Sequence, residues 1–175
     1  MSARTFTKVA PAVWRSRRFI GLPDEAKVGF LYLLSNAHVT SAGVYELPRG
    51  YACADLGWTD AAYASVLREL IEVGLIDHDP DGDVILIERW FRHNPPANDD
   101  HATGTRRRLQ AIESDKLREK AVAAFDEANE IRIQREARKA AEKAAKVAGN
   151  SKSVAQLVGN TSRLMETRLM RGGGQ

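Results

Sequence analysis

The sequence predicts an α+β fold that is mainly helical and contains one small β-hairpin. Apolar residues recur at steps of three and four in residues 63–71, as they do in an amphipathic helix. Two short apolar runs, residues 75–76 and 84–87, flank a turn made of Asp, His, Pro and Gly, which is typical of a hairpin. Residues 105–148 are rich in Ala, Glu, Lys and Arg and have no Pro or Gly, which predicts long exposed helices.

The first elements are expected in residues 24–47. Asp24 follows Pro23 and is predicted to cap a helix, because its carboxylate can accept a hydrogen bond from a free backbone N–H. That helix is expected to run to about Asn36. Its buried face is predicted to consist of Val28, Leu31, Tyr32 and Leu34. After a break at Gly43, residues 44–47 are expected to form a short strand.

Residues 49–76 predict two helices joined by a sharp turn. Residues 49–56 form the first helix, and Gly57 supplies the turn. Thr59 is expected to cap the second helix, and Gly74 to end it in the left-handed conformation. The inward stripe of the second helix is predicted to be Tyr63, Val66, Leu67, Leu70 and Ile71. Two turn-linked helices followed by a hairpin are the core of a winged helix-turn-helix.

Aromatic residues set the expected extent of this domain. All Trp and Tyr residues and all Phe residues except Phe125 precede residue 92, so the core is expected within the first hundred residues. Trp90 and Phe91 are predicted to cover it. The expected divisions are a winged helix-turn-helix domain with a basic N-terminal arm (1–98), a long charged helical region (99–148), and a segment with a break at 149–153, a short helix and a disordered Gly-rich tail (149–175).

The composition limits the cellular setting. A lone Cys53 excludes an intramolecular disulfide and a zinc site built from several Cys residues, and it suits a reducing cytoplasm. The longest apolar run, residues 28–34, is too short to span a membrane, and the basic N-terminus lacks the apolar segment of a secretion signal. A cytoplasmic protein without a membrane partner is expected.

The net charge of +3 conceals three differently charged regions. Residues 1–18 carry five basic residues and no acidic one, whereas residues 19–98 carry five basic and twelve acidic residues. Residues 99–175 carry sixteen basic and eleven acidic residues. The predicted winged domain is therefore acidic and is flanked by two cation-rich arms.

The second predicted helix, residues 59–73, is the candidate for reading bases in a DNA groove. Arg68 and Ser65 are its candidate DNA-binding residues, and Ala61 and Ala64 are suited to contact a thymine methyl group. Acidic side chains surround Arg68: Asp60, Glu69 and Glu72. The alternative interpretation is a protein-interaction or oligomerisation module that does not contact DNA.

The predicted hairpin turn carries four acidic side chains, Asp77, Asp79, Asp81 and Asp83, which DNA phosphate would repel. Asp77, Asp79, Asp81, Gly82 and Glu88 also match positions 1, 3, 5, 6 and 12 of a calcium-binding loop. However, Gly74 interrupts the helix before the loop, and the β-branched residues 84–87 predict a strand after it. The sequence therefore favours a hairpin and leaves an ion-binding role open.

The basic arms are the stronger candidates for nucleic-acid contact. Arg15, Arg17 and Arg18 lie beside Trp14 and Phe19, a combination that can bind phosphate and stack on a base. A second cluster begins the charged helical region and consists of Arg106, Arg107 and Arg108. The alternative is that both clusters are merely solvated surface.

No pattern in the sequence predicts catalysis, a cofactor or a metal site. The four His residues are scattered without metal-ligand spacing, and the Gly-rich tail is not a phosphate-binding loop. Neither Ser65 nor Cys53 has an evident general base nearby in the sequence. A non-enzymatic, binding function is expected.

Residues 6–98 resemble the N-terminal winged-helix domain of phage and prophage replication initiators, the replisome-organiser or DnaD-like group. The resemblance rests on the segment around Trp14, the helix at residues 26–34, the strand at residues 43–47, and Arg89-Trp90 leading into Asn94-Pro95. It implies a protein that binds an origin or single-stranded DNA, self-associates and recruits host replication proteins. Residues 99–175 depart from the family pattern, because they show no aromatic-rich helicase-recruiting domain.

Three functional hypotheses follow. The first is a phage-type DNA-binding protein in replication initiation, in which the winged helix self-associates and the basic arms bind DNA. The second is a phage or prophage transcriptional regulator that reads DNA with residues 59–73. The third is a protein-interaction adaptor that does not bind DNA. The sequence leaves open the DNA site, its strandedness, the oligomeric state and the partner of the C-terminal helices.

Overall fold

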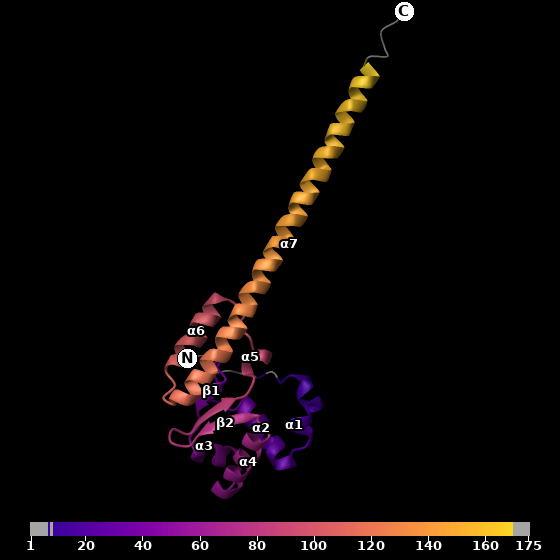
Figure 1. Cartoon of the computed structure of the whole chain (residues 1–175). Helices are drawn as coiled ribbons and strands as arrows, with labels where there is room; N and C mark the ends of the chain where they lie inside the picture. Colours follow the sequence, from indigo (N-terminus) through magenta and orange to yellow (C-terminus); the bar gives the residue numbers. More distant parts are fainter. Residues whose placement is uncertain (1–6, 8, 170–175) are drawn as a thin grey trace, which may run out of the picture. The chain divides into compact units, whose positions relative to one another are not determined.

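The computed structural model describes Thr7 and residues 9–169, with side chains described as far as residue 146. The elements in chain order (Figure 1) are η1 (Pro11–Arg15), α1 (Arg17–Ile20), α2 (Asp24–Ser35), β1 (Val44–Glu46), α3 (Arg49–Leu56), α4 (Asp60–Glu72), β2 (Ile76–Asp79), β3 (Val84–Ile87), α5 (Trp90–His93), α6 (Asp99–Gln110) and α7 (Asp115–Leu169). The chain divides into two compact units, residues 1–130 and 131–175. The expectation of a mainly helical α+β fold is confirmed.

The β-structure is a three-stranded antiparallel sheet in the order β1-β3-β2. Strands β2 and β3 form the predicted hairpin, with Ile76 opposite Ile87. The strand predicted at residues 44–47 is also present, as β1. It pairs with the edge of β3 that does not pair with β2. Because β3 lies in the centre, all four of its side chains are buried.

Gly43 precedes β1 and allows the chain to approach α5 closely. Its backbone is left-handed, with φ of 67°, a conformation that favours glycine. A Cβ atom at this position would lie 2.1 Å from Cγ of Trp90. The Trp90 indole in turn donates a hydrogen bond to the carbonyl of Ser41 at 2.9 Å. These contacts fix Trp90 over the core, as the sequence predicts, and Phe91 is buried beside it.

Helix α2 departs from the sequence prediction at its start and on its buried face. Asp24 is the first helical residue and pairs with Lys27 at 2.9 Å; the cap position is Pro23, and no side chain caps it. The fully buried residues are Ala26, Gly29, Phe30 and Leu33. The predicted face was therefore only partly right: Leu31, Tyr32 and Leu34 are half-buried against the core, but Val28 is 50% exposed. Because residues 28–34 are apolar on nearly every side, periodicity did not identify the inner face. Gly29 allows Val66 of α4 to pack closely.

Helices α3 and α4 form as predicted, with Gly57 in the left-handed conformation between them. Thr59 accepts a hydrogen bond from the Ala62 amide at 3.3 Å and therefore caps α4. The predicted stripe of α4 is buried except for Ile71, which is 39% exposed. Gly74 has a φ of 67° and follows the end of α4, as expected.

The core extends beyond residue 98, which corrects the predicted domain limit and the expectation of exposed helices in residues 99–148. Six apolar side chains from α6, α7 and the turn between them are buried: Ala102, Leu109, Ile112, Leu117, Ala121 and Phe125. Phe125 meets Phe91 with ring centroids 5.3 Å apart. In Figure 1, α6 lies beside the first turns of α7. Residues 117, 121 and 125 recur every four positions, so they form one stripe that α7 turns inward.

Helix α7 also corrects the predicted break at residues 149–153, because it is continuous from Asp115 to Leu169. A single glycine inside a helix costs only about 1 kcal/mol, and many strong helix formers precede Gly149. The predicted tail, residues 170–175, lies outside the described residues. Among the helices that the structure describes, none is long and apolar enough to cross a membrane.

Candidate nucleic-acid interface

Trp14, Arg15 and Arg17 form an exposed surface, which we call the Trp14 surface. Pro11 starts the short helix η1, which ends at Arg15, and α1 begins two residues later. Trp14 is 60% exposed, yet its ring is held by an edge-to-face contact with the buried Phe19 at 5.2 Å. Both arginines are exposed, and neither forms an ion pair with another described residue. An exposed aromatic ring beside two unpaired cations is suited to bases and phosphates.

Arg18 belongs to the same predicted cluster but has a different environment. Its guanidinium donates a hydrogen bond to the Gly74 carbonyl at 2.8 Å. This contact satisfies a free carbonyl after the end of α4 and holds Arg18 against the connection between α4 and β2. The structure therefore divides the predicted cluster of Arg15, Arg17 and Arg18 into two.

On α4, the outer face carries Arg68 as its only cation. Arg68 is exposed and Ser65 is half-buried, so both reach the face predicted to read a groove. Asp60 on this helix is 3.6 Å from Arg49, which offsets part of its charge. One oxygen of Glu69 is buried and has no hydrogen-bond partner among the described residues. The face remains acidic overall.

The second predicted arginine cluster is also divided. Arg106 forms an ion pair with Asp126 at 2.5 Å and lies over the Phe125 ring, 5.1 Å from its centroid. Arg108 donates to the Ser41 hydroxyl at 3.2 Å. Of the three, only Arg107 has neither an ion pair nor a side-chain hydrogen bond to the rest of the described chain. Two of these three arginines thus hold α6 against its neighbours.

The acidic hairpin, residues 76–87, is covered by cations of α7 that sequence reasoning did not connect with it. Asp77 lies 3.4 Å from Lys116 and 3.0 Å from Lys120. Ser114, just before α7, donates a hydrogen bond to Asp79 at 2.5 Å. Lys116 and Lys120 are four residues apart, a spacing that places both on one helix face and could have suggested a common acidic partner.

These contacts change the titration of the hairpin. Burial by itself would raise the pKa of Asp77, but the hydrogen bond and charge of Lys120 lower it below its usual value. Hydrogen bonds from Ser114 and from the Asp81 amide also lower the pKa of Asp79. Both carboxylates are therefore held in the charged form by groups around them.

The residues that match the calcium-loop pattern are not arranged around a common ion site. Asp77 and Glu88, which match loop positions 1 and 12, both contact the ammonium group of Lys120. Strands β2 and β3 fold this window into a hairpin, whereas such a loop lies between two helices. In the described part of the chain, no group of three or more His, Cys, Asp or Glu side chains is placed to hold a metal ion.

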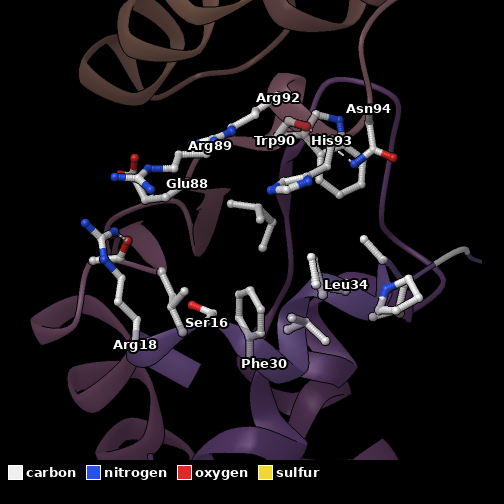
Figure 2. Close-up of a pocket in the computed structure, with 18 residues that line it drawn as sticks. Ser16, Arg18, Phe30, Leu34, Glu88, Arg89, Trp90, Arg92, His93 and Asn94 are labelled. Atoms are coloured by element: carbon white, nitrogen blue, oxygen red, sulfur yellow. Dashed lines mark hydrogen bonds between the residues drawn. The ribbon is translucent and has the colours of Figure 1, made fainter. Parts of the chain in front are cut away.

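A pocket that the sequence did not suggest lies between η1, α2, the end of β3 and α5, with a volume of about 720 Å³. Phe30 and Leu34 from α2 form its lower wall in Figure 2, and Arg89 and Arg92 lie along its upper edge. Arg18 rises on the side where Glu88 lies. The pocket thus combines an apolar interior with charged residues at its edge.

Comparison of the chain with protein-family models, with curated proteins and with solved structures finds no match.

Proposed function

We propose that this chain is a non-catalytic DNA-binding protein with a winged helix-turn-helix domain. The element order α2-β1-α3-α4-β2-β3, with β1 paired to β3, supports the winged-helix assignment. The turn between α3 and α4, with Gly57 left-handed and Thr59 as cap, supports the helix-turn-helix. These features support the fold assignment, and the DNA-binding surface is argued separately.

The Trp14 surface is the observation that carries the DNA-binding proposal. Phosphate contacts made by Arg and Lys supply most of the affinity for DNA, and aromatic side chains add stacking on unpaired bases. Arg15 and Arg17 provide unpaired cations, and Trp14, next to Arg15 in the chain, keeps its ring exposed while in contact with Phe19. A fixed ring loses less conformational freedom when a base stacks on it. The surface therefore favours single-stranded DNA or the junction at a melted site.

A role in phage-type replication initiation, together with self-association and contact with host replication proteins, rests on the resemblance of residues 6–98 to the initiator family. Binding of single strands is consistent with that role, because initiators act where the duplex opens. The acidic outer face of α4 offers little phosphate affinity, which favours this role over a groove-reading regulator.

The proposal is tested by fluorescence anisotropy with labelled single-stranded and double-stranded oligonucleotides of random sequence. Salt is titrated from about 50 to 200 mM, where phosphate contacts lose affinity steeply. The Arg15→Ala/Arg17→Ala variant is expected to lower the slope of log K against log salt by about two units and the affinity by about tenfold or more. The matched control is Arg135→Ala/Lys139→Ala, which removes the same charge from exposed positions in the second unit.

Trp14→Ala separates stacking from charge. It is expected to weaken single-strand binding by about 1 to 3 kcal/mol while leaving the salt slope unchanged. If Arg68→Ala instead relaxes sequence choice on duplex DNA and the Trp14 surface variants have no effect, the regulator hypothesis replaces the initiator hypothesis. Absence of salt-dependent binding to either form of DNA would refute the proposal and favour the adaptor.

A further inference from the structure

The pocket between η1, α2 and α5 has walls suited to an apolar side chain. Val13, Leu34 and Ile87 present aliphatic groups to it, from three different elements. Phe30 and Trp90 also line it, but each is only 6% exposed, so neither offers a free ring face for stacking. The walls therefore offer no free ring face on which a nucleobase could stack, although Ser16, His93 and Asn94 also line the pocket.

The edge of the pocket is positively charged. Arg18, Arg89 and Arg92 line it, and Glu88 is the one acidic residue among the lining side chains. Glu88 is already paired with Lys120 of α7. Within the described part of the chain, the guanidinium groups of Arg89 and Arg92 form no ion pair. The edge therefore presents three cations without a balancing acid.

The positions of these cations along the edge are set by the backbone and, for Arg18, by a hydrogen bond. Arg18 is oriented by its hydrogen bond to the Gly74 carbonyl. Arg89 has a left-handed backbone with φ of 58°, an uncommon conformation for a residue other than glycine, at the turn from β3 into α5. Arg92 follows three residues later, one turn along the same segment. Because Arg18 is already oriented, its side chain loses less conformational entropy when a ligand binds.

Three separate cations require a ligand with more than one anionic group, and the apolar walls require an apolar side chain between them. A peptide with carboxylates on both sides of a large apolar residue meets both conditions. Arginine favours such ligands because its planar fork pairs with carboxylates through two hydrogen bonds.

Neither terminal segment of this sequence supplies that peptide. Residues 1–8, which precede the pocket wall, carry Arg4 and Lys8 and no acidic residue. Residues 147–175 carry four basic residues and one acidic residue, Glu166. Both segments would be repelled by the edge of the pocket. The charge of the site is complementary to another protein.

We propose that this pocket docks an acidic segment of a partner protein, with one apolar side chain inserted among the aliphatic walls and the flanking carboxylates paired to Arg18, Arg89 and Arg92. The site is distinct from the Trp14 surface and does not depend on DNA binding. It gives the protein a means of recruiting a second protein while its DNA-binding surface is occupied.

The full chain is titrated against a fluorescein-labelled peptide of sequence Asp-Glu-Phe-Leu-Asp-Glu. Two matched peptides test the apolar side chains and the carboxylates separately. One has Ser in place of Phe and Leu, and the other has Lys in place of Asp and Glu. The acidic apolar peptide is expected to bind at least tenfold more tightly than either. In ¹H–¹⁵N spectra it is expected to shift the Trp90 indole and the Gly74 amide, which lie at the pocket.

The Arg89→Asn/Arg92→Gln variant removes two cations; Asn tolerates the left-handed backbone, so the fold is retained. It is expected to weaken peptide binding by about tenfold or more, whereas the control Arg135→Gln/Lys139→Gln has no effect. Leu34→Gln tests the apolar wall and is expected to weaken binding similarly, with thermal melting as a check of folding.

Three results would overturn the proposal. The first is equal binding of the three peptides, and the second is unchanged affinity in Arg89→Asn/Arg92→Gln. The third is displacement of the peptide by an oligothymidylate that shifts the same pocket residues, which would make the pocket a nucleic-acid site. If the Trp14 surface does not bind DNA, these three peptide-binding results are unaffected. The DNA-binding proposal and the peptide-docking proposal can therefore be refuted separately.

Discussion

The ammonium group of Lys120 lies 3.0 Å from Oδ2 of Asp77, and this ion pair joins α7 to the acidic hairpin. The same group also contacts Glu88, the residue that follows the neighbouring strand β3. Asp77 is 18% exposed and Glu88 is 23% exposed, so both carboxylates are largely withdrawn from water. One lysine of α7 therefore offsets two acids of the sheet.

Lys120→Ala is expected to lower the free energy of unfolding by about 1 to 2 kcal/mol. The loss exceeds that of an exposed ion pair because Glu88 and Asp77, both largely withdrawn from water, lose their shared cation, and only Asp77 keeps a second one, Lys116. Urea unfolding at neutral pH measures it. The matched control, Lys139→Ala, removes an exposed lysine of the same helix and is expected to change stability by less than about 0.5 kcal/mol. Equal effects of the two substitutions would contradict the role of this ion pair.

His78 in the hairpin is expected to make the free energy of unfolding depend on pH near neutrality. Burial lowers the pKa of His78 below its usual value, although Asp83, 3.9 Å away, opposes the shift. Because the unfolded chain then takes up a proton before the folded chain does, the free energy of unfolding falls as the pH drops below about 6.5. His78→Gln is expected to flatten the profile between about pH 7 and 5, and an unchanged slope in urea unfolding at stepped pH would refute this assignment.

A separate loss of stability is expected at acid pH. The pKa of Asp77 lies below its usual value in the folded chain because Lys120 outweighs the opposite effect of burial. Its stabilising contribution is therefore present above about pH 4 and disappears as the pH falls through the folded pKa. In Lys120→Ala this acid-side decline is expected to be shallower than in the parent protein.

Phe125→Ala tests whether the start of α7 belongs to the first unit. Phe125 is 1% exposed and packs on Phe91, so truncation is expected to cost about 3 to 5 kcal/mol. Ile133→Ala is the control, since Ile133 on the same helix is 50% exposed. Differential scanning calorimetry is the measurement. Small and equal shifts in the two variants would restore the predicted limit at residue 98.

Gly43→Ala tests the close approach of the chain to Trp90. Both the left-handed backbone and the contact with the indole oppose a Cβ atom, so a cost of about 3 kcal/mol or more is expected. Gly57→Ala is a matched control: Gly57 has nearly the same φ, 66°, but no atom lies within 4 Å of its added Cβ. It is expected to cost only about 1 kcal/mol. Similar losses would show that backbone conformation alone accounts for Gly43.

The sequence identified the basic residues that could bind DNA. It did not show which of them are free of contacts within the fold. Arg15 and Arg17 are exposed, as a DNA-binding role requires. Arg106 and Arg108 instead make contacts within the fold, and Arg18 lines a pocket. Charge along a chain does not reveal the partners of each group, because those partners come from distant segments.

The sequence by itself determined the elements that depend on neighbouring residues. The turn at Gly57, the cap at Thr59, the end of α4 at Gly74 and the hairpin all follow from local backbone preferences and hydrogen bonds. Tertiary structure alone decided the inner face of α2, the burial of Phe125, the pairing of Lys120 with Asp77, and the pocket. Each of these depends on which surfaces meet across the fold. An apolar stripe or a charged residue in the sequence shows only that a packing or ion-pair partner is needed. Which residue becomes that partner depends on how the whole chain packs.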